Sequence, residues 1–450
     1  MKKQNLRYMK WIGKMIILLF IFNFQFSIFN CSAQRVSLDE CLEKALESNF
    51  SIKIIRNEAR MDKNNLNYST FLPTLEGTAK QTQTRNDTKT ENSAGEVNKM
   101  SDVKTDNYTA GVALNWRIFD GLEMFTTHEK QKELLAMGEL AVQQAVENLI
   151  LNVSAAYYNV LVQHHKLMAA RHSLELSNER YDEARVRYKI GNRSGLEAQQ
   201  AKIDLNTDSS TYVRQKEALK SAYITLNKLM NTDLQMVNYV QDTILLGPQL
   251  VLGTLEQKTL AGNTTLLIAK KDQKISALDL KNARAVLFPT LDFNSGYNYN
   301  KTDTPSSSTT LNRSNGFYWG FSLNVPIFSR LQNRTKIKNA KLELENTELS
   351  YQEVEKETLG DLALMYNSYE NNLLMVNFEI ESAEVAEDNL DAALEKYKIG
   401  SLSGIEFREF QRSYIDAVDR KLSAIYQAKV SELSLLLLSG EIRSAIAFVE

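Results

Sequence analysis

The chain has 450 residues, of which 43% are hydrophobic, and its 53 basic and 55 acidic residues nearly balance. This balance excludes the basic surface typical of nucleic-acid-binding proteins and the acidic bias typical of disordered tails. Only 5 prolines and 18 glycines interrupt the sequence, which predicts long, continuous helices.

The first 33 residues have the pattern of an export signal. Basic residues precede an apolar segment from about Met15 to Phe29, and small residues follow, so we expect cleavage after Ala33. One alternative is that the apolar segment remains as a membrane anchor, and another is that Cys31 carries a lipid. Removal of Cys31 leaves Cys41 as the single cysteine, which excludes a disulfide within the chain.

Residues 34–231 form a first unit in which helical and strand patterns follow one another. From Val142 to Tyr188, apolar or small residues recur at alternating steps of four and three, the spacing of a coiled-coil stripe. Upstream, around Trp116, the period drops to two, as expected for a strand. The elements expected here are helices at about 37–71, 120–190 and 195–231, and strands at about 74–84 and 107–118 joined by a polar loop over 85–106.

A connector over 232–252 leads to a second unit over 253–439, and residues 440–450 form a C-terminal tail. The octet that begins at Tyr188 returns almost unchanged at Tyr397, so the chain is a tandem duplication. The second unit is expected to hold helices at about 254–288, 329–399 and 404–439, and strands at about 290–300 and 316–326 joined by a polar loop.

The four expected strands each carry one apolar, partly aromatic face. In a β-sandwich such a face would be covered by a core, but everything else in this chain is predicted to be helical. An apolar outer face with polar residues behind it is typical of a lipid-facing hairpin. Four strands cannot close a barrel and lipid does not tolerate an open edge, so we expect several chains to build one barrel.

The helix lengths give an independent prediction. Each unit has one helix of about 70 residues and two of about half that length, and at about 1.5 Å per residue the long helix spans about 105 Å. Two short helices placed end to end therefore match one long helix. The helices are expected to form a rod that projects from the hairpins in one direction.

Residues with special backbone geometry mark the ends of these elements. Pro73 and Pro289 lie where helix gives way to strand, and proline ends helical hydrogen bonding there. Pro326 and Gly121 mark the return from strand to helix. We expect these four residues to fix the helix–strand junctions.

The two repeated turns have the composition of capped helix ends. Glycine favours the left-handed cap of the preceding helix, and serine favours the N-cap of the next. A well-capped hairpin is one interpretation; the other is that both turns form the far tip of the rod and contact another molecule there. The turn residues assigned to this contact are Gly191, Ser194, Gly195, Gly400, Ser403 and Gly404.

The order of these elements, repeated once, resembles that of the outer membrane efflux protein family, the TolC-like channels of Gram-negative bacteria. The motifs that carry the resemblance are Phe71-Leu72-Pro73-Thr74-Leu75, Ile118-Phe119-Asp120-Gly121 and the opening segment Val36 to Leu46. The resemblance implies a mainly α protein with transmembrane β-strands: a homotrimer with a 12-stranded outer-membrane β-barrel, continued in the periplasm by an α-helical coiled-coil barrel. The connector and the C-terminal tail would form an equatorial band around it.

The resemblance also implies a function and partners. The chain would be the exit duct of a tripartite efflux or type I secretion system and would passively conduct substrates from an inner-membrane pump and a periplasmic adaptor. The alternative is a periplasmic coiled-coil structural or adhesion protein without a pore. The sequence contains no glycine loop for phosphate and no Cys/His cluster, so no enzyme, catalytic residue, metal or cofactor is expected. The transported substrate is left open.

A gate at the tip is implied by the same resemblance. Tyr397 matches the gate tyrosine of the family, and the acidic positions that would form rings in a trimer are Glu197, Glu406 and Glu409. The alternative for these glutamates is simple stabilisation of a helix N-terminus. Leu402 stands where some members carry a gate arginine, so Arg193 and Arg408 are candidates to replace it.

Overall fold

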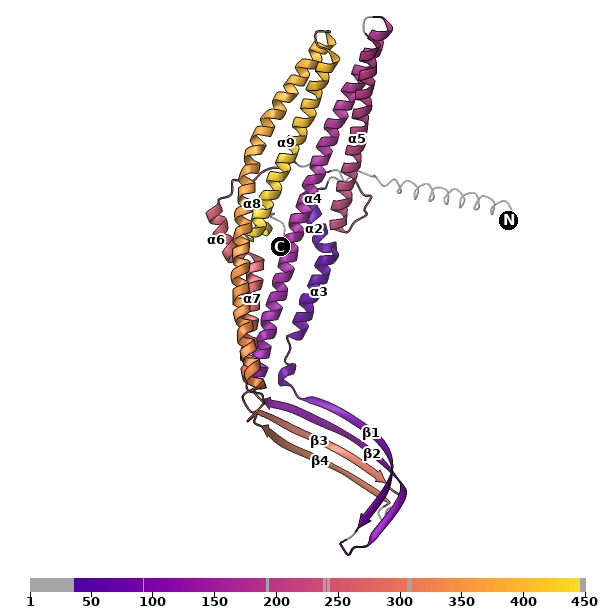
Figure 1. The fold of residues 1–450 in the computed structure, drawn as a ribbon, viewed down its shortest axis with the longest axis vertical. Helices are drawn as coiled ribbons and strands as arrows, with labels where there is room; N and C mark the ends of the chain where they lie inside the picture. Colours follow the sequence, from indigo (N-terminus) through magenta and orange to yellow (C-terminus); the bar gives the residue numbers. More distant parts are fainter. Residues whose placement is uncertain are drawn as a thin grey trace, which may run out of the picture.

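The computed structural model describes residues 36–91, 93–191, 194–237, 240, 243–305 and 310–445. The expected signal peptide, Arg193 and the last five residues of the tail lie outside these ranges. Figure 1 shows a long helical rod with a β-sheet at one end and two helical turns at the other. Within the described residues, no helix is both long enough and apolar enough to cross a lipid bilayer.

The two repeats supply matching elements in the same order (Figure 1). The first contains α2 (Leu38–Ser48), α3 (Phe50–Asn65), β1 (Thr74–Glu91), β2 (Val97–Phe119), α4 (Glu123–Lys189) and α5 (Gly195–Met230). The second contains α6 (Leu252–Gly262), α7 (Thr264–Ala285), β3 (Thr290–Asp303), β4 (Leu311–Asn324), α8 (Gln332–Lys398) and α9 (Gly404–Leu438), and α10 (Ile442–Ala445) follows.

The first helix of each repeat is broken in two, so the expectation of continuous helices at 37–71 and 254–288 was wrong. Asn49 ends α2 and also caps α3, because its side chain accepts the backbone N–H of Ser51. Asn263 does the same between α6 and α7, where it accepts the N–H of Leu266. An asparagine side chain competes with the helical hydrogen bonds and restarts the helix, which the apolar period does not reveal.

The first hairpin is longer than expected, because much of the segment at 85–106 is strand and not loop. β1 and β2 continue pairing up to Glu91 and Val97, with a register shift between Asn86 and Thr88. Backbone pairing does not require apolar side chains where both faces of a ribbon meet water. The polar composition of the segment at 85–106 therefore wrongly predicted a loop. The second hairpin extends the expected strands by only a few residues.

The four strands form one antiparallel sheet in the order β1-β2-β3-β4. The apolar face is continuous across the sheet, since Trp116 pairs with Phe293 and Phe293 pairs with Phe321. Strands β1 and β4 are the two edges, and neither has a second partner within the sheet. The sheet therefore ends in two open edges.

The junction residues lie between the elements as expected. Pro73 precedes β1, Pro289 precedes β3, and Pro326 follows β4. Gly121 has φ of +74°, and a Cβ there would lie 2.5 Å from the carbonyl oxygen of Ala285. The turn into α4 therefore requires glycine for both its backbone geometry and its close packing.

The helices pack in two antiparallel pairs, α4 with α5 and α8 with α9, and α4 also contacts α7 and α9 of the other repeat. The core is widest at the middle of the rod, where large residues such as Tyr157 and Leu161 are buried. Towards the turns, alanines such as Ala383 and Ala417 replace them on α8 and α9. Nearest the turns, large residues such as Tyr397 and Phe407 are buried again.

Candidate functional site at the rod tip

Both turns at the rod tip are capped as the sequence predicts. Gly191 and Gly400 end α4 and α8 with φ of +74° and +80°. Ser194 caps α5 by accepting the N–H of Leu196 at 3.2 Å. Ser403 caps α9 in a two-way capping box: its hydroxyl accepts the N–H of Glu406 at 3.2 Å, and Glu406 accepts the N–H of Ser403 at 2.9 Å.

The capping box describes what Glu406 does within one chain. Its carboxylate is exposed, and hydrogen bonds from the hydroxyl and then the backbone N–H of Ser403 lower its pKa. This supports the simpler interpretation, in which Glu406 stabilises a helix start. Glu409 is exposed one turn further along, and Glu197 is half-buried between the two turns. A role for these glutamates in a gate stays a prediction.

Tyr397 is buried between the two helical hairpins and is only 2% exposed. Its ring stacks on Phe407 of α9 with centroids 5.3 Å apart, and the guanidinium of Arg187 on α4 lies 5.3 Å from its centroid. Burial raises the pKa of Tyr397, and nearby Glu183 raises it further. The side chain is therefore neutral and holds the end of α8 against the first repeat.

Leu402, which stands where the resemblance places an arginine in some family members, is a packing residue in this structure. Leu402 packs against a small apolar cluster that includes Leu390, Tyr397 and Phe407. The turn before α9 is thus held by apolar contact and by its cap. The basic side chains that link the hairpins come from elsewhere on the helices.

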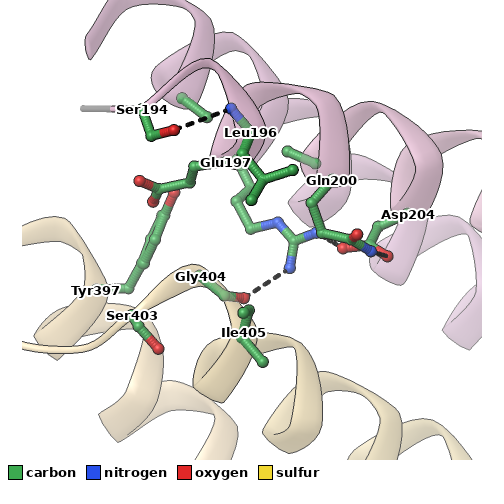
Figure 2. A pocket seen from close by; sticks show the side chains of 12 residues that line it. Ser194, Leu196, Glu197, Gln200, Asp204, Tyr397, Ser403, Gly404 and Ile405 are labelled. Carbon is green, nitrogen blue, oxygen red and sulfur yellow. Dashed lines mark hydrogen bonds and ion pairs between the residues drawn. The ribbon is translucent and has the colours of Figure 1, made fainter. Parts of the chain in front are cut away.

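A cavity of about 330 Å³, here named the tip cavity, lies between the two turns. Figure 2 shows side chains of both repeats facing it, with Leu196 and Asp204 from α5 and Tyr397 and Ile405 from the second hairpin. Arg180 of α4 crosses its wall, where it pairs with Asp204 and donates to the carbonyl oxygen of Gly404 at 3.0 Å. The two hairpins are therefore joined through one arginine.

A second polar contact, deeper in the rod, joins the same hairpins. Arg408 of α9 donates two hydrogen bonds to Asp208 of α5, at 2.6 and 2.8 Å. Gln411, which is fully buried, donates to the carbonyl oxygen of Ser173 at 2.8 Å, and Ser177 donates to Asp208. We name these five residues the Asp208 cluster.

Sequence reasoning named Arg408 as a possible substitute but missed the rest of the Asp208 cluster. The sequence does contain a signal for this cluster, because Asp208 continues the stripe of Ala201 and Leu205 on the buried face of α5. Gln411 likewise follows Phe407 by four residues on α9. Polar residues in an apolar stripe indicate a buried network, since unpaired polar groups are costly there.

Comparison with known proteins places this fold among channels. The family model "Outer membrane efflux protein" matches residues 41–232 and 255–441. The outer membrane protein TolC of Escherichia coli is 20% identical over 343 residues, which cover 73% of this chain and 68% of TolC. The probable outer membrane lipoprotein SilC of Salmonella typhimurium is 21% identical over 345 residues, covering 75% and 73%.

Solved structures show the same fold at low sequence identity. CusC matches with a TM-score of 0.74 and 17% identity, covering 92% of this chain and 96% of CusC. The CmeC outer membrane channel of Campylobacter jejuni matches with a TM-score of 0.73 and 17% identity, covering 90% and 86%. Such identities indicate a shared fold and leave the details of each tip to the individual sequence.

Proposed function

Because the chain belongs to the outer membrane efflux protein family, we propose that three copies of it assemble into one exit duct that works with a periplasmic adaptor and an inner-membrane pump. The protein is an outer-membrane efflux channel with a long periplasmic helical part. Within this function, the trimer, the partners and the gate are the proposed parts.

The observation that carries the proposal is the open, outward-facing aromatic sheet. Trp319, Phe321 and Leu323 of β4 are 62–66% exposed, although burying such side chains is normally favourable. Strands β1 and β4 leave open edges, which a membrane does not tolerate. Three copies joined edge to edge give a closed barrel of twelve strands with its aromatic face towards lipid.

The helices support the same assembly through the symmetry of the repeats. Within one chain, α4 contacts α7 and α9 of the other repeat. The matching contacts of α8 would be with α3 and α5 of a neighbouring copy, and all three helices expose apolar side chains. These exposed residues include Leu342, Leu349 and Leu364 on α8, Ile54 and Met61 on α3, and Ile203 and Val213 on α5.

The tip is proposed to be the gate and the place where the adaptor contacts the channel. Arg180 and the Asp208 cluster hold the two hairpins together in the chain described here. To open the tip, these buried contacts would have to break. They would therefore keep the tip closed, in place of the arginine that some family members carry at the position of Leu402. We also propose that transport through the channel is passive and that the chain is not an enzyme.

A matched pair of variants on β4 tests the channel. Phe321→Arg places a charge on the proposed lipid face, which costs about 2–4 kcal/mol at the bilayer midplane. Ser322→Arg places the same charge on the opposite face. We expect Phe321→Arg to abolish heat-resistant trimers in outer-membrane fractions, and Ser322→Arg to retain trimers whose conductance in planar bilayers is altered. A water-soluble monomer for the unchanged chain would contradict the proposal.

Labelling of intact cells tests the alternative of a periplasmic structural protein without a pore. A cysteine introduced as Lys99→Cys lies in the β1–β2 ribbon and should react with a membrane-impermeant maleimide. Lys216→Cys on α5 is the matched control and should be protected by the outer membrane. Protection of both positions would favour the periplasmic alternative.

A further inference from the structure

The aromatic side of the sheet becomes basic at the end that lies away from the helices (Figure 1). There, Tyr108 of β2 pairs with Lys301 of β3, and Lys301 pairs with Arg313 of β4. Paired residues of an antiparallel sheet point to the same side, and steps of two along β4 lead from Arg313 to Phe321. Tyr108, Lys301 and Arg313, here named the outer row, therefore lie on the aromatic side.

The outer row lies at the expected height of the membrane surface. From Leu323 to Arg313, β4 extends by about 34 Å at about 3.4 Å per residue. A strand tilt of about 40° converts this length to about 26 Å of height, which matches the apolar band of about 25 Å in outer-membrane barrels. Tyr297 and Tyr299 of β3, which are 49% and 40% exposed, form an aromatic girdle just below Lys301.

No carboxylate is paired with the two cations of the outer row. Within the part of the chain that the structure describes, neither makes an ion pair, although Asp303 lies one row further out. The amine of Lys301 lies 5.3 Å from the ring centroid of Tyr108, and Asp106 is paired with Lys104 at 3.1 Å. Like charges directly opposite each other destabilise a sheet, so this arrangement favours an anion bound beside them.

Assembly of the proposed trimer does not neutralise these cations. Strand β4 would pair with β1 of a neighbouring copy, because these two strands are the open edges. On the aromatic side, β1 contributes no acidic residue up to the end of its regular pairing with β2; its residues there are Leu75, Gly77, Ala79, Gln81, Gln83 and Arg85. The trimer would therefore carry a ring of basic pairs at one height.

The basic pair is confined to the outer end of the sheet. At the end next to the helices, the same side of the strands carries uncharged residues such as Trp116, Leu291 and Leu323. The two leaflets of the outer membrane differ in a corresponding way, because the outer leaflet consists of glycolipids with phosphate groups on their sugars. The charge of this end is therefore complementary to the lipid that surrounds it.

We propose that Lys301 and Arg313 bind a phosphate group of the outer-leaflet glycolipid, whose acyl chains lie on the aromatic side below. Arg313 presents a fork of N–H donors that fits phosphate oxygens, and Lys301 adds a point charge from the neighbouring strand. Tyr108 supports Lys301 through its ring. This inference rests on the proposed trimer, because it requires lipid against the outer side of the barrel.

Lipid A, the phosphorylated anchor of this glycolipid, is the probe, and lipid A from which both phosphates have been removed is the control. Native mass spectrometry of the intact trimer in detergent measures the dissociation constant of each. The double variant Lys301→Gln, Arg313→Gln should bind lipid A about tenfold to thirtyfold more weakly, since two charged contacts are lost. Lys80→Gln is the matched control, because Lys80 lies beside the outer row but on the opposite side of the sheet, and it should leave binding unchanged.

A conservative variant separates loss of charge from loss of structure. Arg313→Lys keeps the charge and should bind lipid A within about threefold of the unchanged chain. The proposal is overturned if lipid A without phosphates binds equally tightly, or if the double variant and Lys80→Gln behave alike. It is also overturned if inorganic phosphate at the concentration of lipid A displaces the lipid, because the site would then be one for free anions.

Conductance in planar bilayers separates this inference from the proposed function. The double variant should conduct as the unchanged channel does, because its substitutions face away from the pore. Trimers that conduct but do not distinguish lipid A from its form without phosphates would contradict this inference alone. An unchanged chain that forms no trimer would contradict the proposed function, and with it this inference.

Discussion

The two turns at the rod tip have almost the same sequence but very different surroundings. Tyr188 in the first turn is 54% exposed, whereas Tyr397 at the same place in the second turn is 2% exposed. The second turn also closes a full capping box, while in the first turn the serine hydroxyl accepts a single backbone N–H. A repeated motif therefore specifies the local turn, and the neighbouring helices decide how firmly each turn is held.

Truncation of the two tyrosines should give the largest difference in stability between the two turns. Tyr397→Ala removes the ring that packs on Phe407 and should lower the free energy of opening of the α8–α9 end by about 3–4 kcal/mol. Tyr188→Ala should change the α4–α5 end by less than about 1 kcal/mol, because its ring is mostly in solvent. Hydrogen exchange of peptides at both ends measures the two values. Equal losses in the assembled trimer would show that another chain covers Tyr188 and that the asymmetry is confined to the single chain.

The Asp208 cluster offers the next test, because it joins residues of both hairpins in a buried network. Asp208→Ala leaves Arg408 buried without its partner and should cost about 3 kcal/mol in the exchange of α5 and α9 peptides. The exposed pair of Arg171 and Glu175 is the control, and Glu175→Ala should cost less than about 0.5 kcal/mol. The importance of the cluster would be refuted by similar, small effects of both substitutions.

The helix caps should show a smaller difference in the same direction. Ser403→Ala removes the two hydrogen bonds of the serine hydroxyl, which accepts the N–H of Glu406 and donates to the Glu406 carboxylate, and should lower the local stability of α9 by about 1–1.5 kcal/mol. Ser194→Ala removes a single bond and should cost about 0.5 kcal/mol at the start of α5. Exchange of the first-turn amides reports each effect, and a larger loss at Ser194 would reverse the comparison.

Lowering the pH should have the smallest effect on local stability, and it should act on the second turn through Glu406. Its pKa is lowered in the folded chain, so its contribution to stability is present above the unfolded value of about 4.5 and is lost as the pH falls through the folded value. The first turn of α9 should therefore exchange faster below that pH. Glu406→Gln should remove this pH dependence; if the dependence persists in that variant, another group is responsible.

Local sequence signals predicted much of the architecture. The ends of α4, α5, α8 and α9 lie within three residues of their predicted limits, because glycine and serine at the turns act through bonds within one turn of helix. The apolar face of the strands was also readable from its period of two. The breaks at Asn49 and Asn263 were missed, since an asparagine in a helical pattern acts as a cap only when its neighbours leave room for the new helix start.

The sequence by itself determined that this protein is a duplicated helix–hairpin unit with capped turns and strands that carry one apolar, partly aromatic face, because those properties depend on residues close together in the chain. Only the tertiary structure decided that Tyr397 is buried while the corresponding Tyr188 is exposed. It also decided that Arg408 pairs with Asp208 and that a cavity separates the two turns. These depend on side chains about 200 residues apart. Packing between the repeats sets those distances, and no local pattern encodes them.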